Sequence, residues 1–99
     1  MLTRIVRMHF RSEEVGNFLA IFKESHPKIS NVAGVHQVDL FQDWQNPDVF
    51  YTYSIWDNEE CLNAYRDSTL FEGVWAATKA LFAEKPKAYS LRKKNVEEL

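Results

Sequence analysis

The stretch that most constrains the fold of this chain runs from Phe50 to Pro86. It reads as a strand that ends at Trp56, a short capped helix and a longer amphipathic helix. The strand, Val49–Trp56, divides into two alternating sets of residues, and both sets contain aromatic side chains. Neither face of such a strand is suited to water. We therefore expect both faces of its sheet to be covered.

Strand and helix patterns also define the first half of the chain. Residues 2–11 are rich in β-branched and apolar residues without a helical period, which predicts a strand. Ser12 is typical of an N-cap, and the helix that follows is expected to end near Ser25 because Pro27 lacks an N–H group. Residues 35–44 form a second strand. The turn sequence at residues 45–48 predicts that this strand pairs with Val49–Trp56 as an antiparallel hairpin.

Capping residues divide the second helical region into two helices. Asp57 and Glu60 form a capping box for a short helix that ends near Asp67. Ser68 begins a longer helix, which Pro86 stops. Residues 87–93 form a last strand, and residues 95–99 form a polar tail.

The predicted order β-α-β-β-α-β indicates an α+β, ferredoxin-like sandwich with an antiparallel sheet, formed by a single domain over residues 1–94. Both helices of this fold cover one face of the sheet. The bare face is expected to expose apolar residues such as Phe41, Phe50 or Trp56, more than a monomer normally shows. We therefore predict a homodimer in which two sheets close against each other.

Composition excludes several classes of protein. The chain has 99 residues, a formal charge of −2 and 45% hydrophobic residues, which predicts one globular domain without the basic surface that nucleic acid or an anionic membrane requires. Cys61 is the single cysteine, so no disulfide can form within the chain. No signal peptide or membrane-spanning run is visible, and the expected location is the cytoplasm.

The motifs of the central stretch resemble those of the antibiotic biosynthesis monooxygenase family. They are Tyr53 to Glu60, then Leu62 to Tyr65, then Ser68 and Phe71. The resemblance implies a dimeric α/β barrel with a pocket between the sheet and the helices. It also implies oxygenation of phenolic or quinol compounds without a cofactor. The residues used by haem-degrading members fall on Val6, Tyr65 and Trp75, so none is kept and haem degradation is not implied.

Cofactor-free oxygenation needs a base, an apolar pocket and hydrogen-bond donors, because a phenolate or carbanion must pass an electron to oxygen. His36 is the predicted base, since it lies beside apolar residues on the second strand and histidine is a common general base in enzymes. Each candidate also has a structural alternative: a rim histidine, a tyrosine bonded to backbone, or a helix stripe in the core. The predicted substrate-binding residues are Tyr51, Tyr53, Tyr65, Phe71 and Trp75.

Other ligands find little support in the sequence. His9, His26 and His36 are scattered and have no cysteine partners, so no metal site is predicted. The three glycines are isolated, so no phosphate-binding loop is present and no nucleotide cofactor is expected. The leading hypothesis is a cofactor-independent monooxygenase acting on a small aromatic, phenolic or quinol compound. The alternative is a non-catalytic small-molecule-binding or structural dimer module with the same fold.

Overall fold

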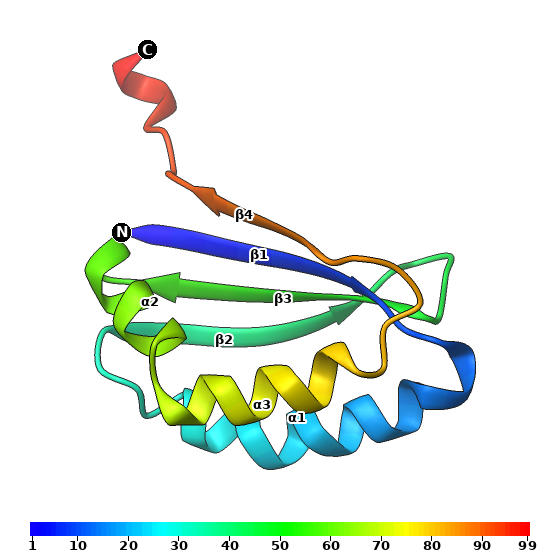
Figure 1. The fold of residues 1–99 in the computed structure, drawn as a ribbon. Helices are drawn as coiled ribbons and strands as arrows, with labels where there is room; N and C mark the ends of the chain where they lie inside the picture. Colours follow the sequence, from blue (N-terminus) through cyan, green and yellow to red (C-terminus); the bar gives the residue numbers. More distant parts are fainter.

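The computed structural model, which describes residues 1–99, contains one four-stranded antiparallel sheet (Figure 1). The strands are β1 (Leu2–His9), β2 (Val35–Gln42), β3 (Val49–Trp56) and β4 (Lys87–Leu91), in the spatial order β2-β3-β1-β4. The helices are α1 (Val15–Ile29), α2 (Glu59–Arg66) and α3 (Thr69–Lys79), with short 3-10 turns η1 (Ser12–Glu14) and η2 (Val96–Glu98). This is the ferredoxin-like α+β fold that the sequence predicts, with the second helical region split in two.

The two faces of the sheet differ because α1 and α3 lie side by side on the same face (Figure 1). Arg4, Val6 and Met8 of β1 point toward the helices, as do Thr52, Ser54 and Trp56 of β3. The alternate residues point away from them. We call this second side the helix-free face; its apolar residues are Ile5, Phe41, Tyr51, Tyr53, Ile55, Tyr89 and Leu91.

The core lies between the sheet and the helices, at the end of the sheet where β1 meets α1. Its centre consists of Met8, Phe10, Phe18 and Phe50. Phe10 is fully buried and stacks on Phe18, with ring centroids 4.1 Å apart. Phe50 and Trp56 belong to this side of the sheet and are buried, so the expectation that the bare face exposes them is wrong. Phe41 is 55% exposed on the helix-free face.

Pro27 does not end the first helix. The helix continues to Ile29, so the expected end near Ser25 is wrong. Proline removes one backbone hydrogen bond, and only two residues follow it in the helix. The buried Ile29 holds this turn against the sheet, and His26 Nε2 donates a hydrogen bond of 2.7 Å to the backbone carbonyl of Val38 in β2. Packing therefore outweighs the local preference.

Three helix ends differ from the capping predictions. Ser12 opens the η1 turn and donates its hydroxyl to Asp48, and does not cap α1. The N-cap of α2 is Asn58, whose side chain accepts from the N–H of Cys61 at 2.9 Å; Asp57 lies one residue too early. The helix α3 ends at Lys79, before Pro86, and Phe82 forms an isolated bridge with Phe10. The N-cap of α3 is Ser68, as predicted.

Residues beyond β4 leave the body of the molecule. The last strand ends at Leu91, two residues before the predicted end, and the η2 turn projects away from the sheet (Figure 1). The division into a domain over residues 1–94 and a tail over residues 95–99 stays a prediction. None of the helices has the length and apolar character needed to cross a membrane.

Candidate functional site

A cavity of about 310 Å³ lies between the sheet and the helices. All four strands and the three α-helices contribute to its lining, and most of the lining side chains are apolar. Ligand pockets in proteins usually range from about 300 to 1,000 Å³. The cavity therefore has room for a small ligand of one or two rings.

Aromatic side chains form one wall of this cavity. Tyr65 of α2 stacks on Trp56 of β3, with ring centroids 5.2 Å apart and planes inclined by 27°. Tyr65 also meets the edge of Phe71 at 5.2 Å, and Phe71 stacks on Trp75 at 5.8 Å with the planes inclined by 10°. The wall thus offers flat surfaces to a flat ligand, because aromatic rings prefer offset-stacked and edge-to-face contacts.

Local sequence places this wall by fixing the start of one helix and one close approach between two segments. Ser68 accepts a hydrogen bond from the N–H of Phe71, which starts α3 directly after α2. Gly34 has a φ of +86° and lies directly against Cys61 of α2, where a Cβ atom would come within 2.5 Å of the cysteine sulfur. Its carbonyl also accepts the N–H of Asp57 at 2.8 Å. Gly34 therefore lets α2 lie close to the end of the sheet.

Tyr65 brings a free hydroxyl group to the cavity. This hydroxyl forms no hydrogen bond with another protein group, and burial raises the pKa of Tyr65 to about 12. A phenol with so high a pKa stays protonated at neutral pH. Tyr65 is therefore available as a hydrogen-bond donor to a ligand oxygen.

The other polar groups of the cavity carry positive charge or none. Arg4 and Arg66 both line it. Thr52 and Ser54 add hydroxyl groups, and the hydroxyl oxygen of Ser54 accepts a hydrogen bond of 3.0 Å from Trp56 Nε1. No histidine, carboxylate, lysine or cysteine lines the cavity. A conventional general base is therefore missing from its lining.

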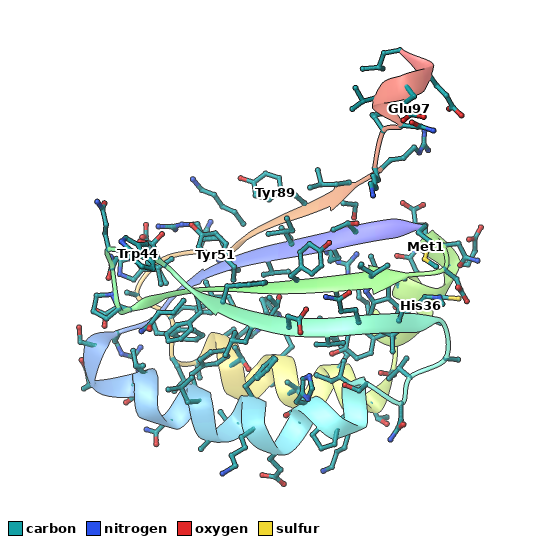
Figure 2. The ribbon with its side chains drawn as sticks, turned by 180° about the vertical axis from the view of Figure 1, so that it is seen from behind. Met1, His36, Trp44, Tyr51, Tyr89 and Glu97 are labelled. Carbon is teal, nitrogen blue, oxygen red and sulfur yellow. The ribbon has the colours of Figure 1, made fainter.

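The structure brings together three of the six predicted site residues. Tyr65, Phe71 and Trp75 line the cavity. Tyr51 and Tyr53 lie on the helix-free face, and Figure 2 shows Tyr51 on the side of the sheet away from the helices. Neither tyrosine lines the cavity, and their role in substrate binding stays a prediction.

His36 lies at the irregular start of β2. The register shifts between Val35 and Gln37, which marks His36 as the extra residue of a β-bulge. Its side chain is 45% exposed and its Nε2 pairs with the carboxylate of Asp57, outside the cavity (Figure 2). The assignment of His36 as the base stays a prediction, and the cavity geometry lends it no support.

Sequence reasoning missed the polar residues that β1 and β3 turn toward the helices. Arg4 occupies an otherwise mostly apolar set of alternating residues in the first strand, and Thr52 and Ser54 share an alternating set with buried aromatics. The available signal for these residues was a polar side chain among alternating residues that are otherwise apolar. Nowhere does the structure bring together three or more side chains of the metal-ligating types His, Cys, Asp and Glu.

The fold and the cavity define a class: a small ferredoxin-like α+β protein with an apolar, aromatic-lined ligand cavity between sheet and helices. The sequence identifies one family within that class. Residues 1–76 match the model of the antibiotic biosynthesis monooxygenase family, and the chain belongs to this family. No curated protein is similar enough in sequence to match it.

Solved structures share the whole fold at low sequence identity. A crystal structure of an antibiotic biosynthesis monooxygenase is 18% identical, with a TM-score of 0.90, and the match covers 96% of this chain and 100% of that one. A conserved protein from Methanosarcina mazei Go1 is 19% identical with a TM-score of 0.89, covering 95% and 94% of the two chains. Rv0793 from Mycobacterium tuberculosis is 14% identical with a TM-score of 0.87, covering 95% of each. Identities this low establish the fold alone.

Proposed function

We propose that this protein is a cofactor-independent monooxygenase that oxidises a small phenol or quinol in the cavity between its sheet and helices. The observation that carries the proposal is the combination of an apolar, aromatic-lined cavity of about 310 Å³ with the free hydroxyl of Tyr65. Membership of a monooxygenase family points to the same chemistry.

The reaction requires only the phenol and oxygen. Loss of the phenolic proton gives a phenolate, which passes one electron to O₂; the radical pair combines at a ring carbon to form a C–O bond. The resulting hydroperoxide loses water and leaves a carbonyl group, so a phenol and one O₂ give a quinone and one H₂O. The substrate supplies all four electrons, and no external reductant is needed.

The cavity residues suit the steps that bind and orient the substrate. Phe71 and Trp75 would stack on the ring, and Tyr65 would donate a hydrogen bond to the oxygen on which negative charge develops. The apolar lining keeps water from the hydroperoxide and admits O₂ readily. His36 is not needed for any of these steps.

Oxygen uptake tests this proposal. Purified protein with a panel of phenols, quinols and anthrone-type compounds is expected to consume one O₂ per quinone formed, as measured with an oxygen electrode and mass spectrometry. Tyr65→Phe should lower kcat by about tenfold to several hundredfold, since it removes a donor to the oxyanion. Tyr89→Phe, which removes an equal hydroxyl group from an exposed residue outside the cavity, serves as the matched control and should behave as wild type. Uptake no faster than without protein would refute the proposal.

A second candidate function rests on the absence of a general base from the cavity lining. A non-catalytic module would capture a flat aromatic compound in the same cavity without converting it. Stoichiometric binding by calorimetry, with unchanged ligand recovered after incubation in air, would favour this alternative.

We also propose that the protein acts as a homodimer through its helix-free face. Tyr89 is 50% exposed, Leu91 47% and Phe41 55%, and all three lie on that face. Trp44, at the tip of the β2–β3 hairpin, is 98% exposed, and Figure 2 shows it on the same side as Tyr89. An apolar surface of this kind is typical of an interface, and a second open sheet is the matching partner.

Analytical ultracentrifugation at micromolar concentration tests the dimer. Wild-type protein should sediment as a dimer, and Phe41→Glu combined with Tyr89→Glu should shift it to monomer. Leu19→Glu is the control: Leu19 is 41% exposed, but it lies on α1, away from the helix-free face. A well-folded wild-type monomer would refute the proposal.

A further inference from the structure

Two arginine side chains line the apolar cavity. Their backbones lie at the end of the sheet where β1 begins and α2 lies (Figure 1). Arg4 comes from β1, and its guanidinium donates a hydrogen bond of 2.9 Å to the hydroxyl of Ser90 in β4. Arg66 is the last residue of α2 and follows Tyr65 directly. The cavity therefore has a cationic end beside its aromatic wall.

Neither arginine has an anionic partner within the chain. The ion pairs of the structure involve Arg7, Arg11, Lys28, His9 and His36, but not Arg4 or Arg66. Arg66 also forms no side-chain hydrogen bond, although Glu59 and Asp67 are close to it in sequence. The only neighbour that Arg4 contacts by a polar bond is a neutral hydroxyl.

The surroundings of Arg4 are unfavourable for its charge without a ligand. Burial lowers the pKa of Arg4, and the positive charge of Arg66 lowers it further. Guanidinium groups remain charged in proteins, so the partly buried charge of Arg4 persists beside the apolar surface, with the exposed charge of Arg66 near it. A partly buried charge is normally paired, because its lost hydration must be replaced. An anion between the two guanidinium groups would relieve both the desolvation and the repulsion.

We propose that Arg4 and Arg66 form an anion subsite, so that the cavity binds its flat aromatic ligand through an ionised oxygen group, a phenolate or a carboxylate. Arginine suits this role because its planar fork of donors matches carboxylate and phenolate oxygens. The inference rests on the proposed function only in taking a flat aromatic compound as the ligand.

The subsite changes the chemistry expected of a phenol. A bound phenolate beside two cations is favoured over the neutral phenol, and the proton passes to solvent. Substrate ionisation would then depend on the arginines, and not on a side chain that accepts the proton. This accounts for a cavity that contains Tyr65 as a donor but no imidazole or carboxylate.

The pKa of a bound phenol distinguishes this subsite from a merely apolar cavity, because the two shift it in opposite directions. Burial without cations disfavours the phenolate and raises the pKa, whereas a nearby positive charge lowers it. The probe is 4-nitrophenol, whose phenolate absorbs visible light. Binding is expected to lower its pKa by about one unit or more, which means phenolate binding about tenfold or more tighter than that of the phenol.

A second probe separates the two kinds of anion. 1-Naphthoate is compared with the neutral 1-naphthamide by quenching of tryptophan fluorescence, since Trp56 and Trp75 line the cavity. We expect naphthoate to bind at least about tenfold tighter. Tight naphthoate with no phenolate effect would assign the subsite to carboxylates, and the reverse to phenolates; either result supports it.

Variants assign the effect to the arginines. Arg66→Gln removes no hydrogen bond from the folded chain, so it should fold normally and lose most of the preference for the anion. Arg4→Lys keeps a positive charge at position 4 and should retain part of the preference for the anion. Arg92→Gln is the matched control, because it removes an equal charge from an exposed residue outside the cavity.

All titrations are made without oxygen, so they do not depend on turnover. A protein that consumes no oxygen can still show the subsite, and an active monooxygenase can lack it. A raised or unchanged pKa of bound 4-nitrophenol together with equal affinity for naphthoate and naphthamide would overturn the proposal. Failure of both probes to bind at millimolar concentration would overturn it as well.

Discussion

Replacing Gly34 by alanine should destabilise the protein more than any other single methyl group added to a glycine of this chain. Gly34 has a φ of +86°, a conformation that residues with a Cβ atom rarely adopt. Its added Cβ would lie 2.5 Å from the sulfur of Cys61 and 2.6 Å from the Cβ of Cys61. Backbone strain and steric overlap therefore act together at this position.

The expected loss of stability can be worked from these two terms. A left-handed conformation costs a non-glycine residue roughly 1–2 kcal/mol, and overpacking against neighbours costs about 1–3 kcal/mol. Alanine restricts the unfolded chain, which returns about 0.4–1 kcal/mol. The net destabilisation of Gly34→Ala is about 1–4.5 kcal/mol, and a value in the middle of this range lowers the Tm of a domain this small by on the order of 15 °C.

Urea unfolding followed by circular dichroism, at one fixed protein concentration, measures this loss. The chain supplies its own controls: Gly16 and Gly73 lie in α1 and α3, and an added Cβ there meets nothing within 4 Å. Gly16→Ala and Gly73→Ala should stabilise the protein by about 0.4–1 kcal/mol, because alanine favours the helix.

A double-mutant cycle separates strain from overlap. Cys61→Gly removes both atoms that the new methyl group would meet. In that background Gly34→Ala should cost only the backbone strain less the unfolded-state offset, about 0–1.5 kcal/mol. A cost of Gly34→Ala below about 0.5 kcal/mol in the wild-type background would refute the reasoning. Equal costs in both backgrounds would show that the close approach of Gly34 to α2 does not constrain the fold.

Three further changes test the core and its ionisable groups. Phe10→Ala should lower the free energy of unfolding by about 3–5 kcal/mol, because the side chain is fully buried and stacked on Phe18; a urea-derived loss below about 2 kcal/mol would contradict this. Burial raises the pKa of Tyr65 from 10.0 to about 12, so the stability it contributes is present below pH 10 and lost as pH rises toward 12. Tyr65→Phe should remove this loss; urea midpoints across that range measure it, and an unchanged alkaline slope would contradict it. The hydrogen bond from His9 holds the pKa of Glu84 below its usual value, so His9→Gln should raise the Glu84 titration midpoint in NMR; no change would show that the pair does not form.

The order of elements could be predicted because local signals agree with the fold at most positions. The strand Val49–Trp56 has the predicted bounds, and Ser68 caps α3 as its sequence context indicates. Pro27 is the clearest exception. Its effect on α1 is offset by the burial of Ile29 and by the bond from His26 to Val38 of β2, and the neighbouring sequence does not show that these residues meet the sheet.

The orientation of the central strand could not be predicted in the same way. In Val49–Trp56 both alternating sets contain aromatic residues, so the pattern does not say which set faces the helices. The structure turns Thr52 and Ser54 toward the cavity and leaves Tyr51 and Tyr53 on the helix-free face. The alternation of this strand therefore contains no signal that could say whether Tyr51 and Tyr53 face the cavity.

The position of His36 depends on one extra residue in a strand. Strict alternation from Val38 would place His36 on the helix side of β2. The bulge between Val35 and Gln37 breaks this alternation, and His36 pairs with Asp57 at the exposed end of the sheet. A bulge changes which face of the sheet a side chain occupies, and no residue in this segment predicts a bulge.

The cationic end of the cavity shows why chemistry was harder to predict than fold. Arg4 and Arg66 are 62 residues apart in the chain, and each alone is an ordinary basic residue on a strand or at a helix end. Only the ferredoxin-like topology, which lays α2 over the start of β1, brings them to one cavity. A search for a base selects histidines and carboxylates, whereas this cavity favours an ionised substrate through cations that cannot accept a proton. The groups that would ionise the substrate are therefore defined only when the folded chain brings Arg4 and Arg66 to the same cavity. Substitution of these arginines is the first test of this chemistry.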